Sequence, residues 1–488
     1  MQFLTCPPPG SPRCVRRDNL SDGKGFALLL CGIPGASLPG LCVLGGALQD
    51  QSTATDLPSG KGTHEGLLLL AEVAALEAEA ATPADWRLVA DAYGRLSTLY
   101  PRDHRYGGNR GNALWIADRP REALDAYRQA ILLAPEDPVL FRGLGNVLVD
   151  LRAFEAADRA YAFSRAHGDS PLTAWNHSQL LGGLENYESS YALAEWRWQL
   201  AGVEPWRDSA QAWRGEPAGW KEPLLVWSEQ GLGDTLQHLR WLGPLCWQRG
   251  GDAAPLTLEV ESCLVELLRE ALGDLQPQPL VQAKPATGSA APWPGWHVSL
   301  LSLPALLKGA PIPPRAVWLG SPRWSQPAGR RRVGLVWAAG RKLSNPVTMR
   351  EYHRRSLGNE DLRRLVDGLH ALGCQPVLLQ FGFDQGMGSR WRQAGVESLA
   401  EDADFAATAE VVAGLDLVIT VDTAMAHLVG AMQRQDWVLL PFSAAPRWLR
   451  GRDDTPWYPG LRLFRQSVPG EWGMVVEQVL GELARHFG

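Results

Sequence analysis

The chain has 488 residues, a length that suggests about two to four domains. Hydrophobic residues make up 45% and charged residues 20% of the sequence, a composition typical of soluble globular proteins. The formal net charge is −6 and there is no long basic run, which argues against nucleic-acid binding. Seven cysteines without a C-x-x-C pair argue against a disulfide framework or a zinc site, and they indicate a reducing, cytoplasmic location.

Residues 1–63 are not expected to form a folded domain. Their apolar part, GFALLLCGIPGASLPGLCVLGGAL, is interrupted by Pro34, Pro39 and several glycines, whereas a membrane-spanning helix needs about 20 apolar residues. A signal sequence or anchor is the alternative, but the charged stretch before it is long and no cleavage site is convincing. We expect a disordered leader or an incorrectly assigned start codon. No other segment is apolar enough to span a membrane, so any membrane association would be peripheral.

A period of 34 residues marks residues 64–200. The spacing is followed by three tyrosines and three pairs of smaller residues, namely Tyr93, Tyr127 and Tyr161, Gly111 and Gly145, Ala123 and Ala157, and Pro101 and Pro135. The pattern resembles the tetratricopeptide repeat, in which two helices approach closely through small residues. Because one such unit cannot bury its own apolar face, we predict a stack of helix pairs, with a degenerate third unit ending in YESSYALAEWRWQL.

Strands and helices alternate after this array. Residues 201–221, rich in Pro, Gly and Trp, are predicted to be a linker or docking segment. The predicted strands cover residues 223–228, 255–261, 375–380, 416–421, 436–441 and 461–466, and the predicted helices cover 232–250, 262–273, 359–373, 404–415, 423–432 and 471–487. Residues 276–294 are predicted to form a loop, WHVSLLSLPALL closes the first half, and RRVGLVWAAG opens the second.

This alternation predicts two α/β lobes, 222–328 and 329–488. Each lobe should contain a parallel sheet with helices on both faces, as in Rossmann-like folds. Because ligands of such sheets bind beyond the carboxyl ends of the strands, we expect the two lobes to face a cleft.

The segment LDLVITVDTAMAHLVGAM, residues 415–432, places polar groups at one such carboxyl end. Asp422 is predicted to cap the following helix, which Thr423 and Ala424 would open. The free N–H groups and the dipole of that helix would favour an anion, and His427 lies one turn later on the same face as Thr423. The alternative is a capping aspartate with a core histidine.

Several segments resemble a known family. VGLVWAAG, DFAATAEVVAGLDLVITVDTAMAHLVGAM, WVLLPF and PRWLRGRDDTPWYPGLRLFRQ resemble the C-terminal lobe of ADP-heptose:lipopolysaccharide heptosyltransferases, and more closely the bacterial tetratricopeptide proteins with a heptosyltransferase-like domain. EQGLGDTLQHLRWLGPL resembles the opening of the family's N-terminal lobe. The resemblance spans about residues 64–488, and the order of the parts is similar, more distantly, to O-GlcNAc transferases.

The resemblance implies an α + α/β chain, in which tetratricopeptide repeats precede two Rossmann-like lobes in the GT-B arrangement. The lobe 222–328 would face the acceptor and the lobe 329–488 would bind the nucleotide sugar. The implied activity is an inverting, metal-independent glycosyl transfer from a nucleotide-diphospho-sugar, with no further cofactor, to a protein or glycan acceptor that the repeats recruit.

The resemblance also assigns roles to residues. Asp234, next to Gly233, would be the base that deprotonates the acceptor hydroxyl, although capping of its own helix is an alternative role. Four residues, Asp422, Thr423, Ala424 and His427, match the Asp-Thr-x-x-x-His pattern that holds the diphosphate and sugar of the donor. Arg355 is the best match to the family's cation in this lobe and Lys342 the second, while the alternative is a solvated basic loop.

Two departures leave the function open. MQRQDW stands where the family has Gly-Lys-Pro, and Ala424 replaces a Gly that often follows the Thr, which narrows the space for a heptose. The identity of the donor is therefore undetermined. The competing hypothesis is a repeat scaffold or binding protein whose transferase lobes have lost their activity.

Overall fold

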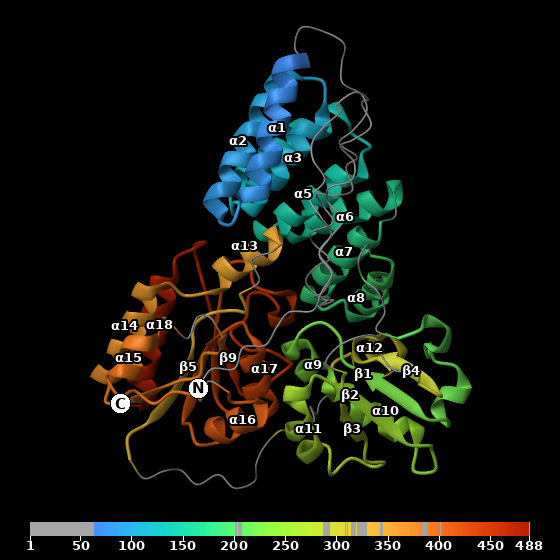
Figure 1. Cartoon of the computed structure of the whole chain (residues 1–488), viewed down its shortest axis with the longest axis vertical. Coiled ribbons are helices and arrows are strands. Elements are labelled where there is room, and N and C mark those ends of the chain that lie inside the picture. The colour runs from blue at the N-terminus through green and yellow to red at the C-terminus, as the bar shows by residue number, and fades with distance from the viewer. Residues whose placement is uncertain are drawn as a thin grey trace, which may run out of the picture. The chain divides into compact units, whose positions relative to one another are not determined.

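The computed structural model describes residues 63–168, 170–200, 203, 207–285, 293–307, 309, 311–313, 319, 329–341, 345–382, 386, 388–400 and 402–487, which all belong to one compact unit, Pro39–Gly488 (Figure 1). The predicted leader, up to residue 62, lies outside the described residues. Within the described part of the chain, no helix has both the length and the apolarity that crossing a bilayer requires.

The first part of the described chain is helical. The helices are α1 (Thr63–Glu79), α2 (Pro83–Leu99), α3 (His104–Ile116), α4 (Pro120–Leu133), α5 (Pro138–Asp150), α6 (Phe154–His167), α7 (Pro171–Gly183) and α8 (Tyr187–Ala194). Proline occupies the first helical position of α2, α4, α5 and α7, where its missing N–H costs no hydrogen bond. Each helix packs against the next along the chain, as expected for stacked helix pairs.

The 34-residue period has a direct packing cause. A Cβ atom on Gly111 would lie 2.8 Å from the ring of Tyr127, and one on Gly145 would lie 2.5 Å from the ring of Tyr161. The hydroxyl of Tyr127 donates to Asn112, and that of Tyr161 donates to Asn146 at 2.7 Å. The same glycine–tyrosine–asparagine contact therefore recurs at an interval of one repeat.

The first α/β lobe is built on a four-stranded parallel sheet. Its strands are β1 (Leu224–Trp227), β2 (Leu256–Val260), β3 (Leu280–Ala283) and β4 (Trp296–Ser299), in the order β3-β2-β1-β4. The helices are α9 (Leu232–His238), α10 (Leu242–Arg249), α11 (Val265–Ala271) and α12 (Leu303–Leu306). The strand order reverses between β1 and β4, the position where open parallel sheets bind ligands.

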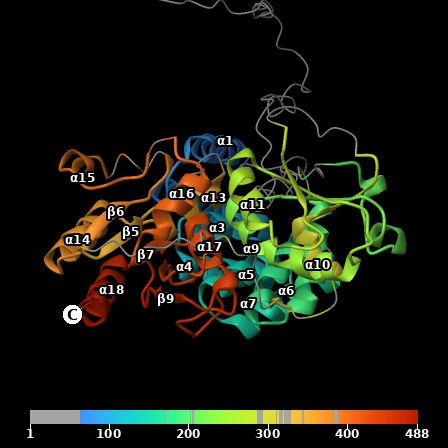
Figure 2. The same ribbon diagram turned by 90° about the horizontal axis from the view of Figure 1, so that it is seen from below.

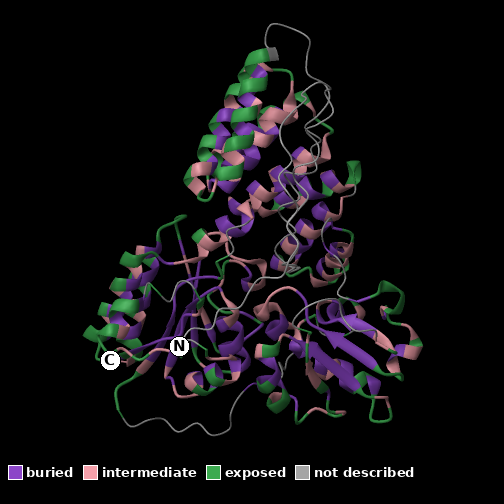
Figure 3. Cartoon of the chain, in the orientation of Figure 1, coloured by how far each residue is buried: buried purple, intermediate pink, exposed green. Residues whose placement is uncertain are grey.

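The second lobe has a five-stranded parallel sheet in the order β6-β5-β7-β8-β9. Its strands are β5 (Arg332–Val336), β6 (Gln375–Leu378), β7 (Leu417–Val421), β8 (Asp436–Leu440) and β9 (Leu461–Arg465), and its helices are α13 (Pro346–Arg355), α14 (Asn359–Ala371), α15 (Ser389–Gln393), α16 (Phe405–Ala413), α17 (Ala424–Ala431) and α18 (Trp472–Phe487). Most of the strand residues of both lobes are buried (Figure 3).

The two lobes share apolar packing. Helix α9 of the first lobe contacts α17 of the second, and α11 contacts α16 (Figure 2). One continuous cluster of buried side chains includes Leu236 on α9 and Met425 and Leu428 on α17. The carboxyl ends of β1 and β7, which carry the polar motifs found in the sequence, are thereby brought face to face.

Three details differ from the sequence-based expectation. Strand β3 lies within the predicted loop 276–294. It was not predicted because it is a short, partly exposed edge strand without a buried apolar run. The predicted helix 232–250 is divided by a 3₁₀ turn at Leu239–Trp241. The second half of the basic segment before Ser356 is not a solvated loop, since it forms α13, which has Asn345 as its N-cap and Pro346 as its first residue.

The predicted linker packs on the first lobe in its described part. Trp213 is buried, and its main-chain N–H donates to the carbonyl of His297 at 2.7 Å. Its indole N–H donates to the carbonyl of Glu216 at 3.0 Å. Trp213 therefore connects the described part of this segment to the first lobe.

Candidate active site

The first half of the site is the corner between β7 and α17. Thr423 is the N-cap of α17, since its hydroxyl accepts from the N–H of Met425 at 3.2 Å and its backbone is extended. The expectation that Asp422 caps the helix is therefore wrong by one residue. The Asp422 side chain is buried just before the cap. Ala424 occupies the first helical position, which the prediction had assigned to Thr423.

Asp422 has one cationic neighbour from α13. The residue is 3% exposed, and Arg355 Nη1 lies 3.6 Å from its Oδ2 and donates to its carbonyl oxygen at 3.2 Å. No hydrogen bond to Asp422 Oδ2 is present among the described residues. The structure thus brings Arg355 to the predicted donor corner, whereas Lys342 lies outside the described residues.

The second half of the site is the start of α9 in the first lobe. Asp234 is the third residue of this helix, and its Oδ2 accepts from the N–H of Gly231 at 3.1 Å. The carboxylate therefore does cap its own helix. A Cβ on Gly233 would lie 2.8 Å from His427 Cδ2 and 3.3 Å from Ala424 Cα, so the glycine permits the close approach of α9 to α17.

Arg447 connects the two halves. Its Nη2 donates to Asp234 Oδ1 at 2.8 Å, and its Nη1 contacts Gln237 Oε1 at 2.8 Å and His427 Nε2 at 3.1 Å. The residue follows β8, in the short 3₁₀ turn Pro446–Trp448. The sequence contained this arginine in the segment PRWLRGR, but spacing alone could not distinguish it from Arg450 and Arg452.

His427 belongs to the site, and its side chain is buried. Its ring stacks on Trp448, with centroids 5.5 Å apart, and its Nδ1 lies 2.9 Å from the hydroxyl of Tyr458. Because a guanidinium can only donate, Nε2 must be the acceptor and Nδ1 carries the proton. Burial, reinforced by the charge of Arg447, lowers the pKa of His427 to about 3, so the ring is neutral at physiological pH.

The charge of Arg447 also sets the state of Asp234. Burial alone would raise the pKa of this carboxyl, but the guanidinium outweighs it and holds the pKa below the usual value. His238, one turn further along α9, has its pKa lowered to about 4, chiefly by burial. The site at neutral pH therefore contains an ionised Asp234, a cationic Arg447 and two neutral histidines.

A cavity of about 220 Å³ lies elsewhere along the carboxyl edge of the second sheet. Its walls come from the repeats, from α13 and from the segments after β8 and β9, and they include Asp118, Asp150, Arg350, Phe442 and Gln466. The lining does not include Asp234, Asp422 or His427. Arg354 of α13 lines this cavity, whereas the next residue, Arg355, contacts Asp422.

Comparison with known proteins gives similarities at several levels. No protein-family model matches the chain. Protein FlbA of Caulobacter vibrioides is 25% identical over an alignment of 476 residues, which covers 81% of this chain and 75% of that protein.

Among solved structures, a family 9 glycosyl transferase from Veillonella parvula is 12% identical and covers 57% of this chain and 99% of its own, with a TM-score of 0.40. The ADP-heptose heptosyltransferase II of E. coli is 13% identical, with coverages of 55% and 100% and a TM-score of 0.38. An O-GlcNAc transferase of Thermobaculum terrenum is 13% identical, with coverages of 88% and 93% and a TM-score of 0.30. At TM-scores this low, the similarities carry no conclusion about this chain, whose fold follows from its own strand order.

Proposed function

We propose that the chain is an inverting, metal-independent glycosyltransferase. It would transfer a sugar from a nucleotide-diphospho-sugar to a protein or glycan acceptor recruited by the repeats. The observation that carries the proposal is the meeting, at Arg447, of Asp234 from the first lobe and His427 from the second. The resemblance of both motifs to heptosyltransferase motifs supports the same assignment.

The start of α17 suits the diphosphate of the donor. The N–H groups of a first helical turn have no acceptor within the helix, and the helix dipole adds positive potential there. Arg355 and Arg447 would supply the positive charge that stabilises the leaving diphosphate in the absence of a metal. The Oδ2 of Asp422, which accepts no hydrogen bond among the described residues, would accept one from a hydroxyl of the donor sugar.

Asp234 is proposed as the general base. The acceptor oxygen would form a bond to the sugar carbon as the bond from that carbon to the diphosphate breaks, and the hydroxyl proton would pass to Asp234. In the structure Arg447 pairs with Asp234. A bound diphosphate would compete for this guanidinium, and partial release of Arg447 would raise the pKa of Asp234 towards the range useful for a base.

The scaffold alternative also has a specific observation in its favour. Both oxygens of Asp234 already have partners, namely Arg447 Nη2 and the N–H of Gly231. A carboxylate held in this way could serve only to join the lobes and cap α9.

Two measurements separate the hypotheses. Binding of ADP-, GDP-, UDP- and dTDP-sugars is measured by calorimetry and by thermal shift, where a ligand at 100 times its Kd adds about 2.7 kcal/mol of stability. Transfer of radiolabelled sugar to proteins of the host lysate is measured in parallel, with and without a chelator. Binding with transfer that survives the chelator supports the proposal, whereas binding without transfer to any acceptor favours the scaffold.

A further inference from the structure

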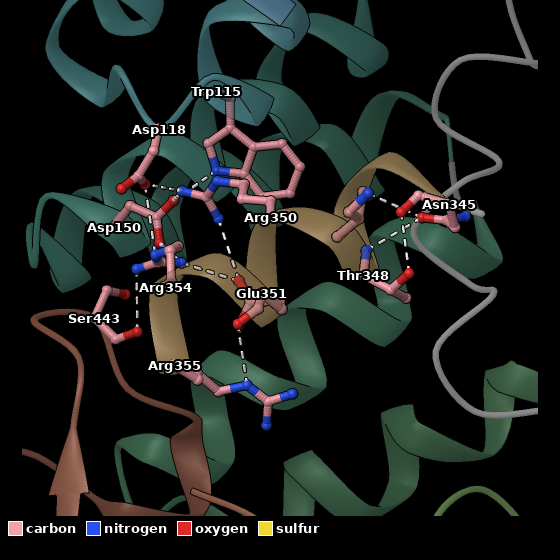
Figure 4. A network of polar contacts seen from close by, with 11 residues as sticks. Trp115, Asp118, Asp150, Asn345, Thr348, Arg350, Glu351, Arg354, Arg355 and Ser443 are labelled. Atoms are coloured by element: carbon pink, nitrogen blue, oxygen red, sulfur yellow. Dashed lines mark hydrogen bonds and ion pairs between the residues drawn. The ribbon is translucent and has the colours of Figure 1, made fainter. Parts of the chain in front are cut away.

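Helix α13 joins the repeats to the donor corner. This helix was not predicted from the sequence. It carries three arginines, Arg350, Arg354 and Arg355. Figure 4 shows these arginines pointing to different partners, with Arg350 towards Trp115 and Asp118 of the repeats.

The end of the cluster at Arg350 is fixed to the repeats. Arg350 is 1% exposed, and its Nη2 donates to Asp118 Oδ1 at 3.1 Å and to Asp150 Oδ2. Its guanidinium lies 4.5 Å from the ring of Trp115, whose indole N–H donates to the same oxygen of Asp150 at 2.6 Å. Met349 adds an apolar anchor, since it is buried in the hydrophobic cluster of the repeats.

Arg354 links three parts of the chain. Its Nη1 lies 3.3 Å from Asp150 Oδ1 in the repeats and 3.0 Å from Glu351 Oε1 on α13. Its Nη2 donates to the carbonyl of Ser443, in the segment after β8, at 3.2 Å. Asp150 therefore forms ion pairs with two arginines of α13. Because these groups are buried, solvent screens their attraction less than it would at the surface.

Arg355 is the next residue and faces the donor corner, where it contacts Asp422. Its Nε also donates to the carbonyl of Glu351 at 3.4 Å. Since the three arginines share one regular helix, displacement of α13 at Arg350 must displace Arg355 as well. The contact between Arg355 and Asp422 therefore depends on how α13 sits on the repeats.

We propose that Asp150, Arg350 and Arg354 are positioning residues for donor binding: they hold α13 on the repeats so that Arg355 meets the diphosphate at the Asp422 corner. This inference rests on the proposed function. It makes the repeats a structural component of the donor site, in addition to any role in recruiting an acceptor. The alternative is that the same network merely holds the two parts of the chain together.

The variant Asp150→Asn removes the shared negative charge and keeps the size of the side chain. Folding should survive, because Arg350 retains Asp118 and Glu351 while Arg354 retains Glu351 and Ser443. The cavity of about 220 Å³ borders Asp150 and both arginines, so water can reach the altered network. A matched control is Glu259→Gln, which removes the carboxylate charge of the buried Arg207–Glu259 pair in the first lobe.

The experiment measures the Kd of ADP, GDP, UDP and dTDP by calorimetry for the wild type and the variants. We expect Asp150→Asn to weaken nucleotide binding by about 3- to 30-fold, the usual range for coupling between sites, and Glu259→Gln to leave it unchanged. Arg355→Met should weaken binding too. In the double variant, which combines Asp150→Asn with Arg355→Met, nucleotide binding should be no weaker than in Arg355→Met alone, because the influence of Asp150 passes through Arg355.

The outcomes are distinguishable. If the wild type binds none of the nucleotides, the proposed function and this inference both fail. If the wild type binds but Asp150→Asn binds equally well, only the inference is wrong. Additive losses in the double variant, or an equal loss in Glu259→Gln, would show that the network acts through general stability and would also overturn the inference.

Discussion

Arg447 donates a hydrogen bond of 2.8 Å to Asp234, a residue that precedes it by 213 positions and belongs to the other lobe. The contact keeps the candidate base ionised, and it also connects the start of α9 to the stacked pair of His427 and Trp448. The ionisation of the candidate base and this polar contact between the two lobes therefore depend on one guanidinium.

The variant Asp234→Asn tests the base. Asparagine keeps an oxygen that can accept from the N–H of Gly231, so α9 remains capped, but it cannot take a proton. We expect kcat to fall by a factor on the order of 10²–10⁴ while the affinity for the nucleotide sugar is retained. Transfer assays and calorimetry on the same preparation check this, and undiminished transfer would remove Asp234 from the mechanism.

The variant Arg447→Met tests the control of Asp234 by its partner. Loss of the guanidinium should raise the pKa of Asp234, because burial then acts without an opposing charge. The acidic limb of the profile of kcat/KM against pH should therefore move to higher pH, and donor affinity should fall. Arg452→Met is the control, since Arg452 pairs with Asp454 instead. An unshifted acidic limb in Arg447→Met would contradict the assignment.

The lowered pKa values of His238 and His427 predict a loss of stability in mild acid. Their pKa values in the folded chain, about 4 for His238 and about 3 for His427, lie below the value of about 6.5 expected in the unfolded chain. As pH falls below about 6.5, the unfolded state binds protons that the folded state does not, so the free energy of unfolding decreases. At pH 5 each histidine should contribute a loss of about 2 kcal/mol.

Urea unfolding at pH 7 and pH 5 measures this effect. The variant His238→Asn should show a smaller decrease between the two pH values than the wild type, by about 2 kcal/mol. His370→Asn, at an exposed position of α14, should decrease as the wild type does. Equal decreases in all three proteins would mean that His238 is not held neutral in the folded state.

The repeat contact predicts opposite effects for two glycines. Gly111→Ala places a Cβ 2.8 Å from the ring of the buried Tyr127, and overpacking of this kind should cost about 1–3 kcal/mol. Gly94→Ala, in α2, meets only the flexible Arg110 side chain at 3.5 Å, so it should gain about 0.5–1 kcal/mol from helix propensity. Denaturant unfolding compares the two, and a neutral Gly111→Ala would argue against tight packing at this contact.

Much of the architecture could be predicted from the sequence. The strands β1, β2, β6, β7, β8 and β9 lie within the predicted segments, because each is a buried apolar run beside a helix of clear period. Strand β3 was missed because an edge strand is specified by backbone pairing rather than by an apolar pattern. Helix α13 was missed because its buried face carries Arg350, whose burial depends on Asp118 and Asp150 far away in the chain.

The candidate site was only partly predictable for the same reason. Asp234, Asp422, Thr423 and His427 stood out because they follow strands in recognisable motifs, and Arg355 lies at the corner as expected. Arg447 did not stand out, since its role depends on the approach of α9 to α17 and not on its local sequence. Contacts between distant segments leave no periodic signal in one sequence.

The anchoring of α13 restricts how the helical array can change its length. The residue one period after Asp118 is Arg152, which shares its left-handed backbone conformation (φ 57° and 61°), and the residue one period after Asp150 is Leu184. A tandem duplication that shifted the array by one unit would therefore replace Asp118 and Asp150, the partners of Arg350, with an arginine and a leucine. We therefore expect insertions to be tolerated only on the α1 side of this contact, so that engineered or evolved extensions grow from that end.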